Sequence, residues 1–216
     1  MIGPSTTPMS VKILIWITCV VSILSPIATL FVMSSLKMLG PGAWFALSYY
    51  GILKGWLWQP LTYFFVHTVG AGISIFFLIN LLFNMFILWF AGSEIADRYG
   101  NRAFYIFYLT SGFVAGLVVL LGIYLSSSNA ILVGSGPPVF ALLTIWAMIY
   151  PNMQLFFLFV VRMKAKWLIL VVLGLALVLN LANGQWIPFL GDLAAILWAL
   201  LIGHFVWHLS FPWKRD

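Results

Sequence analysis

Charged side chains are scarce in this sequence, and their scarcity decides its class. Only 6% of the 216 residues are Asp, Glu, Lys or Arg, whereas an ordinary soluble domain has roughly 25%. A fold surrounded by water cannot cover its surface with so few charges, and 64% of the residues here are hydrophobic. We therefore expect lipid to be the solvent around most of the chain.

Cysteine is almost absent as well. The single cysteine, Cys19, lies in an apolar run and has no partner for an internal disulfide, so it gives no indication of a redox compartment. The formal net charge of +6 would by itself suggest nucleic acid. However, the Lys and Arg residues are scattered over short connections, which is the arrangement that orients membrane spans. We expect no nucleic-acid partner.

Long stretches without acidic or basic residues predict where the chain crosses the membrane, because a spanning helix needs about 20 apolar residues. These stretches are 13–36, 55–93, 103–161 and 167–213, the last interrupted only by Asp192. The first is expected to be a retained span and not a signal peptide. The prediction is an all-α, polytopic membrane protein with one domain, residues 1–216. Its six spans are expected at about 12–36, 70–91, 103–125, 137–150, 167–182 and 187–208.

The basic residues predict the orientation of these spans. Six spans place both termini on one side, and an excess of Lys and Arg there marks that side as cytoplasmic. The residues on that side are Lys12, Arg98, Arg102, Arg162, Lys164, Lys166, Lys214 and Arg215, against Lys37 and Lys54 on the other. The outer connection, 37–68, is rich in Trp and Tyr, which favours a position in the outer leaflet. The compact form is typical of a bacterial plasma membrane protein.

A cluster of Gly and Pro at 134–138 interrupts the fourth span. Successive prolines are excluded from a helix interior but fit a helix start, so this helix is expected to begin near Pro137 and to end near Tyr150. About 14 residues give about 21 Å, less than a hydrocarbon core of about 30 Å. The fourth helix should therefore begin inside the membrane. Residues 130–136 should reach it as irregular chain beside an outward-facing polar pocket.

Three polar side chains are expected near the same depth. Asp192 is the only charged residue within a span, and intramembrane carboxylates usually face a cavity or a partner. Asn80 and Asn84 share one face of the second span because they are four residues apart. Each of the three also fits a plain structural role, as a helix cap or in hydrogen bonds between helices. Close packing is predicted at the small residues Gly112, Gly116, Gly191, Ala195 and Ala199.

Several motifs, in this order and at these spacings, resemble the rhomboid family of intramembrane serine proteases over about residues 45–205. The run 58–67, from Trp58 to His67, is similar to the segment before the family's second span. The run 80–85 resembles its His-x-x-x-Asn helix. The runs 134–142 and 191–195 resemble its Gly-x-Ser-Gly loop and the region of its catalytic histidine. The resemblance implies a six-helix bundle of the rhomboid type with a short fourth helix.

The resemblance also implies a Ser–His dyad, and this sequence departs from it. The Ser position is Gly136 and the His position is Asp192. Glycine supplies no nucleophile, and an aspartate with an ordinary pKa of about 3.9 is a poor base. Pro137 follows where the family has a glycine, and proline has no N–H to donate to an oxyanion.

The remaining family positions are mixed. The family's oxyanion His corresponds to Asn80, while Asn84 and Gly134 match the family pattern. His67 is the one histidine near the expected pocket, which Gly134 and Pro137 should also border; His67 equally fits an interfacial position. Nothing in the sequence predicts a metal site or a cofactor.

The degenerate dyad favours a pseudoprotease that binds transmembrane segments or lipids without cleaving them. Its expected partners are the lipid bilayer and transmembrane segments of other membrane proteins. In an alternative register Ser135 is the nucleophile of an active serine endopeptidase, with Asp192 as its base. A third hypothesis is a small channel or transporter that uses Asp192 as a proton or cation site.

Overall fold

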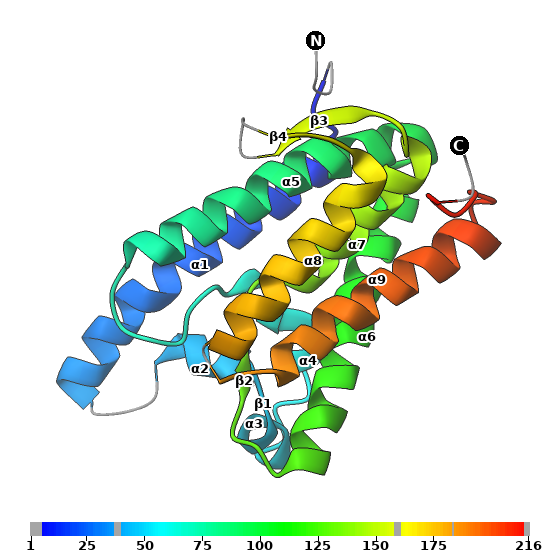
Figure 1. Cartoon of the computed structure of the whole chain (residues 1–216). Coiled ribbons are helices and arrows are strands. Elements are labelled where there is room, and N and C mark those ends of the chain that lie inside the picture. Colours follow the sequence, from blue (N-terminus) through cyan, green and yellow to red (C-terminus); the bar gives the residue numbers. More distant parts are fainter. Residues whose placement is uncertain (1–5, 37–39, 158–160, 183, 214–216) are drawn as a thin grey trace.

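The computed structural model describes residues 6–36, 40–157, 161–182 and 184–213 (Figure 1). Within these residues, five helices are long and apolar enough to cross a membrane. They are α1 (Met9–Leu36), α5 (Ile75–Tyr99), α6 (Asn101–Ser126), α8 (Ala165–Ala182) and α9 (Ile187–Phe205). A shorter apolar helix, α7 (Gly136–Ile149), lies among them. The chain is thus a predominantly helical, polytopic membrane protein, as the sequence predicts.

The bounds of α5 differ most from the predicted spans. The helix begins at Ile75 and not near residue 70, because the Ser74 side chain caps it by accepting a hydrogen bond from Phe77 N at 3.1 Å. It also continues past the predicted end at residue 91. It ends where Gly100 adopts a φ of +88°, a conformation that favours glycine after a helix.

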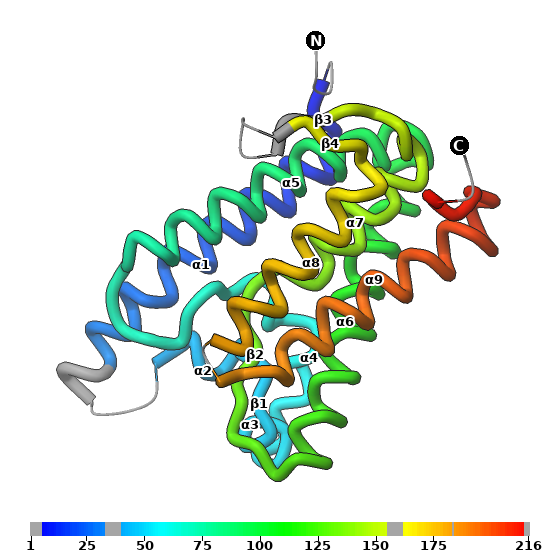
Figure 2. Tube along the Cα trace, in the orientation of Figure 1, coloured from blue at the N-terminus to red at the C-terminus, as the bar shows by residue number. Residues whose placement is uncertain are grey.

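The short helix α7 lies at the centre of the bundle. It packs against α9, α6, α5 and α8, and α1 packs against α5. In Figure 1, α8 crosses in front of α7 and runs beside α9. Helices α5 and α8 make little contact with each other, and in the tube of Figure 2 they diverge toward the loop end. All residues from Pro137 to Ile149 except Phe140 are buried.

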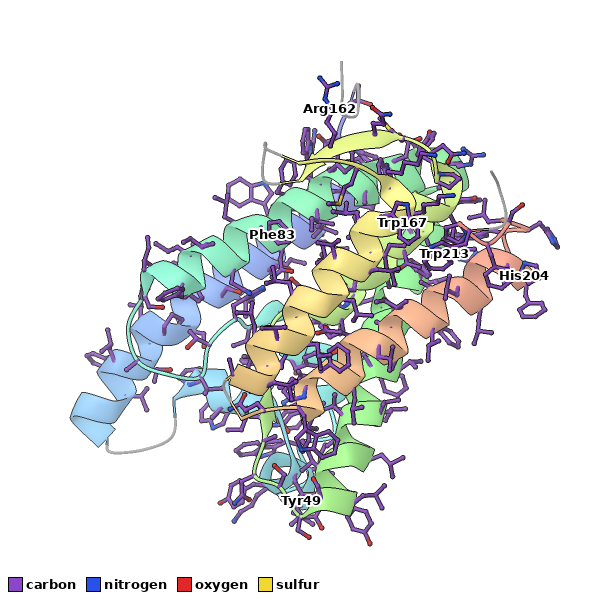
Figure 3. The ribbon with its side chains drawn as sticks, viewed as in Figure 1. Tyr49, Phe83, Arg162, Trp167, His204 and Trp213 are labelled. Atoms are coloured by element: carbon purple, nitrogen blue, oxygen red, sulfur yellow. The ribbon has the colours of Figure 1, made fainter. Side chains whose placement is uncertain are left out.

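Two short sheets, which were not predicted from the sequence, mark the two ends of the bundle. At one end, β3 (Gln154–Phe157) pairs antiparallel with β4 (Val161–Lys164). The starts of α1 and α6 lie at this end, joined by a 2.6 Å hydrogen bond from Ser10 Oγ to Asn101 Oδ1. Figure 3 shows Arg162 here and Tyr49 at the opposite end. We call the first the hairpin end and the second, which residues 40–74 occupy, the loop end.

The chain at the loop end is folded against the helices. Its elements are α2 (Pro41–Phe45), β1 (Leu47–Ser48), α3 (Tyr49–Leu53), α4 (Gln59–Thr62) and the 3-10 helix η1 (Tyr63–Phe65). Strand β1 pairs antiparallel with β2 (Ile131–Leu132), which precedes α7. The fully buried Gln59 side chain accepts a hydrogen bond from Ser48 N at 3.1 Å and donates to Ala43 O at 3.2 Å. These bonds join distant parts of the loop.

Small residues permit this packing. A Cβ built on Gly112 of α6 would lie 2.7 Å from the Phe64 ring, and one on Gly116 would lie 3.0 Å from the Tyr63 ring. The sequence predicts close packing at both glycines, and their partner is the loop instead of another helix. Contact between helices occurs at Gly191 of α9, where a Cβ would lie 2.9 Å from Val119 of α6. Ala195 and Ala199 of α9 are buried along the same helix.

Candidate functional site

The start of α7 is the place where most of the candidate residues meet. This helix has 14 residues against 26 in α6, so it is shorter by about 18 Å at 1.5 Å per residue. Before it, Gly134 adopts a φ of +96°, which favours glycine. Gly134 N lies 2.7 Å from Val66 O and 3.1 Å from Tyr63 O, which both accept its hydrogen bond. The chain that leads into α7 is therefore held against the loop.

Gly136 and Asp192 lie opposite each other, on α7 and α9. A Cβ built on Gly136 would lie 3.5 Å from Asp192 Oδ1. Apart from its own chain neighbours and helix backbone, no other atom of the described residues would lie within 4 Å of that Cβ. Asp192 itself is only 8% exposed. The fold brings together the two positions at which the resemblance places a dyad, and they hold a glycine and an aspartate.

Ser135 bonds to a different side chain. Its hydroxyl, on a fully buried residue, lies 3.2 Å from His67 Nε2, and His67 Nδ1 lies 2.9 Å from Ser22 Oγ of α1. Ser22 Oγ donates its proton to Phe65 O at 2.9 Å. It must therefore accept from Nδ1–H, which leaves Nε2 to accept from Ser135. Within the described residues, no hydrogen bond joins Ser135 to Asp192.

The electrostatics of His67 fit this arrangement. His67 lies in the loop between η1 and α5, and burial lowers the pKa of its imidazole to about 4. The ring is therefore neutral at pH 7, with one donor nitrogen and one acceptor nitrogen. A Cβ on Gly134 would lie 3.6 Å from His67 Cδ2, so these two predicted pocket residues are adjacent.

The two asparagines of α5 bond to each other. Asn84 Nδ2 donates to Asn80 O and to Asn80 Oδ1, both at 3.0 Å. Asn84 is buried and Asn80 is exposed. They share a face, as their spacing predicts, but neither bonds to Ser135 or Asp192 in the described part of the chain. The amide group of Asn84 is therefore hydrogen-bonded to Asn80 within α5.

Pro137, the third predicted pocket residue, is buried against α9. Its Cγ would lie 3.6 Å from a Cβ built on Gly191. Pro137 and Pro138 occupy the first turn of α7, and neither has an N–H. Of the first three helical residues, only Gly136 has a backbone donor.

Comparison with known proteins identifies the family to which this fold belongs. The family model described as Rhomboid domain matches residues 54–209. The chain belongs to the rhomboid family. It is also similar to Derlin-1 of Homo sapiens and Derlin-1 of Bos taurus, each 26% identical over 160 residues. The aligned part covers 74% of this chain and 57% of each relative, so the chain spans little more than half the length of these proteins.

The hydrogen-bond order Ser135–His67–Ser22 in this rhomboid has the form of a nucleophile, a base and an orienting group. Its surroundings serve catalysis poorly. Ser135 is 0% exposed, and the prolines of the first turn cannot donate to an oxyanion. The array instead ties α1, the loop and α7 together at one point.

Ser22 was not among the residues predicted from the sequence, although a signal for it exists. Thr18, Ser22, Ser25 and Thr29 recur at helical spacing on α1, and all are at most 5% exposed. Hydroxyl residues on one face of an apolar helix indicate a face that packs closely against protein. A Cβ on Gly42 of α2 would lie 2.8 Å from Ser25 Oγ, so this face receives the loop.

Proposed function

We propose that this rhomboid-family protein binds transmembrane segments of other membrane proteins and does not cleave them. The observation that supports this proposal most directly is the 3.5 Å separation between a Cβ built on Gly136 and Asp192 Oδ1. The fold keeps the two positions as close as side chains of a dyad need to be. Without a hydroxyl or thiol at 136 and an imidazole at 192, an acyl-enzyme cannot form there. Asn80 and Asn84 stand at the positions of the oxyanion His and Asn in this proposal.

The proposal includes a topology. Six spans cross the plasma membrane of a bacterial cell, with α7 as a short fourth span that begins inside the membrane. Both termini are cytoplasmic, so the hairpin end faces the cytoplasm. The described basic residues of that end support this orientation, and they are Lys12, Arg98, Arg102, Arg162, Lys164 and Lys166.

The separation of α5 and α8 supports lateral approach of a client helix from the lipid. The two helices make little contact. Their loop-end halves expose large apolar side chains, such as Leu82 of α5 at 72% and Val178 of α8 at 61%. Because lipid tails are as apolar as leucine, such surfaces do not by themselves favour one client over another. Selectivity must come from shape and from polar groups.

One reconstitution tests both halves of the proposal. The full chain is placed in phosphatidylethanolamine–phosphatidylglycerol vesicles with a fluorescently labelled transmembrane client, and energy transfer and client length are followed together. We expect association with a client that stays intact. Fragments of the client would contradict the proposal. Enrichment of one labelled lipid without any association of client would replace it with lipid binding.

The Ser135–His67 bond favours a second candidate, a serine endopeptidase that uses Ser135 as nucleophile and His67, not Asp192, as base. A fluorophosphonate probe separates the two functions, because it labels only an activated and accessible serine. We expect no labelling, since Ser135 is fully buried. Labelling that is lost in both Ser135→Ala and His67→Gln would establish the endopeptidase.

A further inference from the structure

Asp192 is a buried acidic side chain without a partner. It is 8% exposed, and no hydrogen bond or ion pair joins it to any residue that the structure describes. The nearby Tyr63 hydroxyl already donates to Gly112 O at 2.8 Å. His67 is engaged by Ser22 and Ser135. A carboxyl group inside a membrane is costly unless it is paired, so this site lacks one donor or one cation.

The space beside the carboxyl group is open on the side of Gly136. A Cβ there would meet Asp192 Oδ1 at 3.5 Å and nothing else within 4 Å beyond its own neighbours and helix backbone. A glycine at this position therefore leaves room next to Oδ1 that a serine side chain would fill. A group placed where that Cβ would be meets Asp192 Oδ1 and, apart from the neighbours Ser135 and Pro137 and the helix backbone, no other described atom within 4 Å.

The chemistry of a single carboxyl group selects the kind of partner. A metal ion needs several oxygen, nitrogen or sulfur ligands, and the described residues contain no group of three His, Cys, Asp or Glu side chains that could hold one. An ammonium or guanidinium group needs only one carboxylate. A Lys or Arg inside a client helix is costly in lipid for the same reason as Asp192, so pairing removes both costs.

We infer that Asp192 recognises a basic residue within the transmembrane segment of a bound client. This inference rests on the proposed function and specifies the class of client. Asp192 is the sixth residue of α9, so it lies about 8 Å from the loop-end start of that helix at 1.5 Å per residue. The client's Lys or Arg should lie at the same depth, about five residues in from the loop end of the client.

The test compares three synthetic 20-residue leucine-rich helices in the same vesicles. One has Lys at position 5 from the loop end, one has the uncharged isostere norleucine there, and one has Lys at position 15. For the wild-type chain we expect binding about tenfold tighter for Lys at position 5 than for either other helix, from about 1.4 kcal/mol for a hydrogen bond inside a membrane. In Asp192→Asn the preference should disappear while general binding remains.

Each outcome has a separate meaning. Equal affinity of the wild-type chain for Lys and norleucine helices overturns the inference but leaves the proposed function standing. If the wild-type chain binds none of the three helices, the proposed function itself is contradicted. Proton flux through vesicles that Asp192→Asn abolishes, without a preference for Lys, would overturn the inference in favour of an ion pathway. The wild-type comparison of Lys with norleucine decides the inference even if Asp192→Asn does not fold. Glu94→Gln is the control for loss of a carboxyl group, because Glu94 lies toward the hairpin end of α5, away from Asp192.

Discussion

The last two spans, α8 and α9, are similar in length and composition but differ in how the protein holds them. In their most apolar 18-residue stretches, 17% of the residues are buried in α8 and 44% in α9. The buried residues of α9 include Gly191, Ala195, Ala199 and Gly203, which let α6 and α7 approach closely. In α8 the buried residues are Ala165, Lys166 and Ile169, all in the first two turns.

The difference shows that apolar composition inserts a helix in a membrane but does not fix it against its neighbours. Small residues on one face do that, because in lipid the packing of surfaces and not their hydrophobicity drives association. Helix α9 has such a face. Helix α8 is held at the hairpin end, where Ala165 N donates to Met153 O at 2.9 Å, and is mostly exposed beyond it. The side of the bundle at α8 is therefore the less tightly packed side.

Matched glycine substitutions in the two helices should give the largest effect. A Cβ on Gly191 would lie 2.9 Å from Val119, whereas one on Gly174 of α8 would meet nothing within 4 Å. We expect Gly191→Leu to lower the free energy of unfolding by about 1–3 kcal/mol through overpacking. Gly174→Leu should not lower it, because the added side chain meets nothing and a better helix former than glycine stabilises a helix by about 0.5–1 kcal/mol. Thermal unfolding in detergent measures both, and equal losses would remove the distinction between the two helices.

The next prediction concerns motion and should be smaller. Spin labels at Leu82 and Val178 report the distance between α5 and α8, and labels at Leu121 and Leu197 report that between α6 and α9. All four side chains are more than half exposed, so labels should not disturb the core. We expect a broader distance distribution for the first pair, measured by double electron–electron resonance in lipid nanodiscs. Equal widths would show that α8 is as firmly held as α9.

The sequence predicted the long helices well because charge and proline have strong local effects on helix bounds. Gaps in the charge pattern located all five long helices, and Pro137 and Pro151 bracketed α7 within two residues. The candidate site was harder to predict, because the residues that contact one another there are distant in the sequence. Ser22 and His67 are 45 residues apart, and no local pattern indicates that they meet. Asp192 was the one member of the site that the sequence singled out, because it is a lone carboxylate within an apolar run.

The structure of residues 40–66 was the least predictable part. Aromatic residues favoured a position in the outer leaflet, which stays a prediction, but they did not indicate how the segment folds. Gln59 is central to that fold. Its partners are backbone groups, Ser48 N and Ala43 O, and any residue type offers such groups. A sequence therefore does not reveal which ones a buried amide will reach.

The last prediction concerns the tie formed by His67, which joins α1, the loop and the start of α7. Its pKa is about 4 in the folded protein and about 6.5 in an unfolded chain. Between these values the unfolded chain binds more protons. Stability from the neutral ring is therefore complete above about pH 6.5 and declines as the pH falls toward 4. We expect the unfolding temperature of the wild-type chain to fall more steeply over this range than that of His67→Gln.

The difference between the two curves is the informative quantity, because carboxyl groups elsewhere titrate in both proteins. His208→Gln is the matched control, since His208 is exposed and should keep the wild-type slope. A His67→Gln curve parallel to the wild-type curve would mean that the imidazole does not stabilise the contact between α1, the loop and α7. That contact would then depend on the packing of its side chains alone.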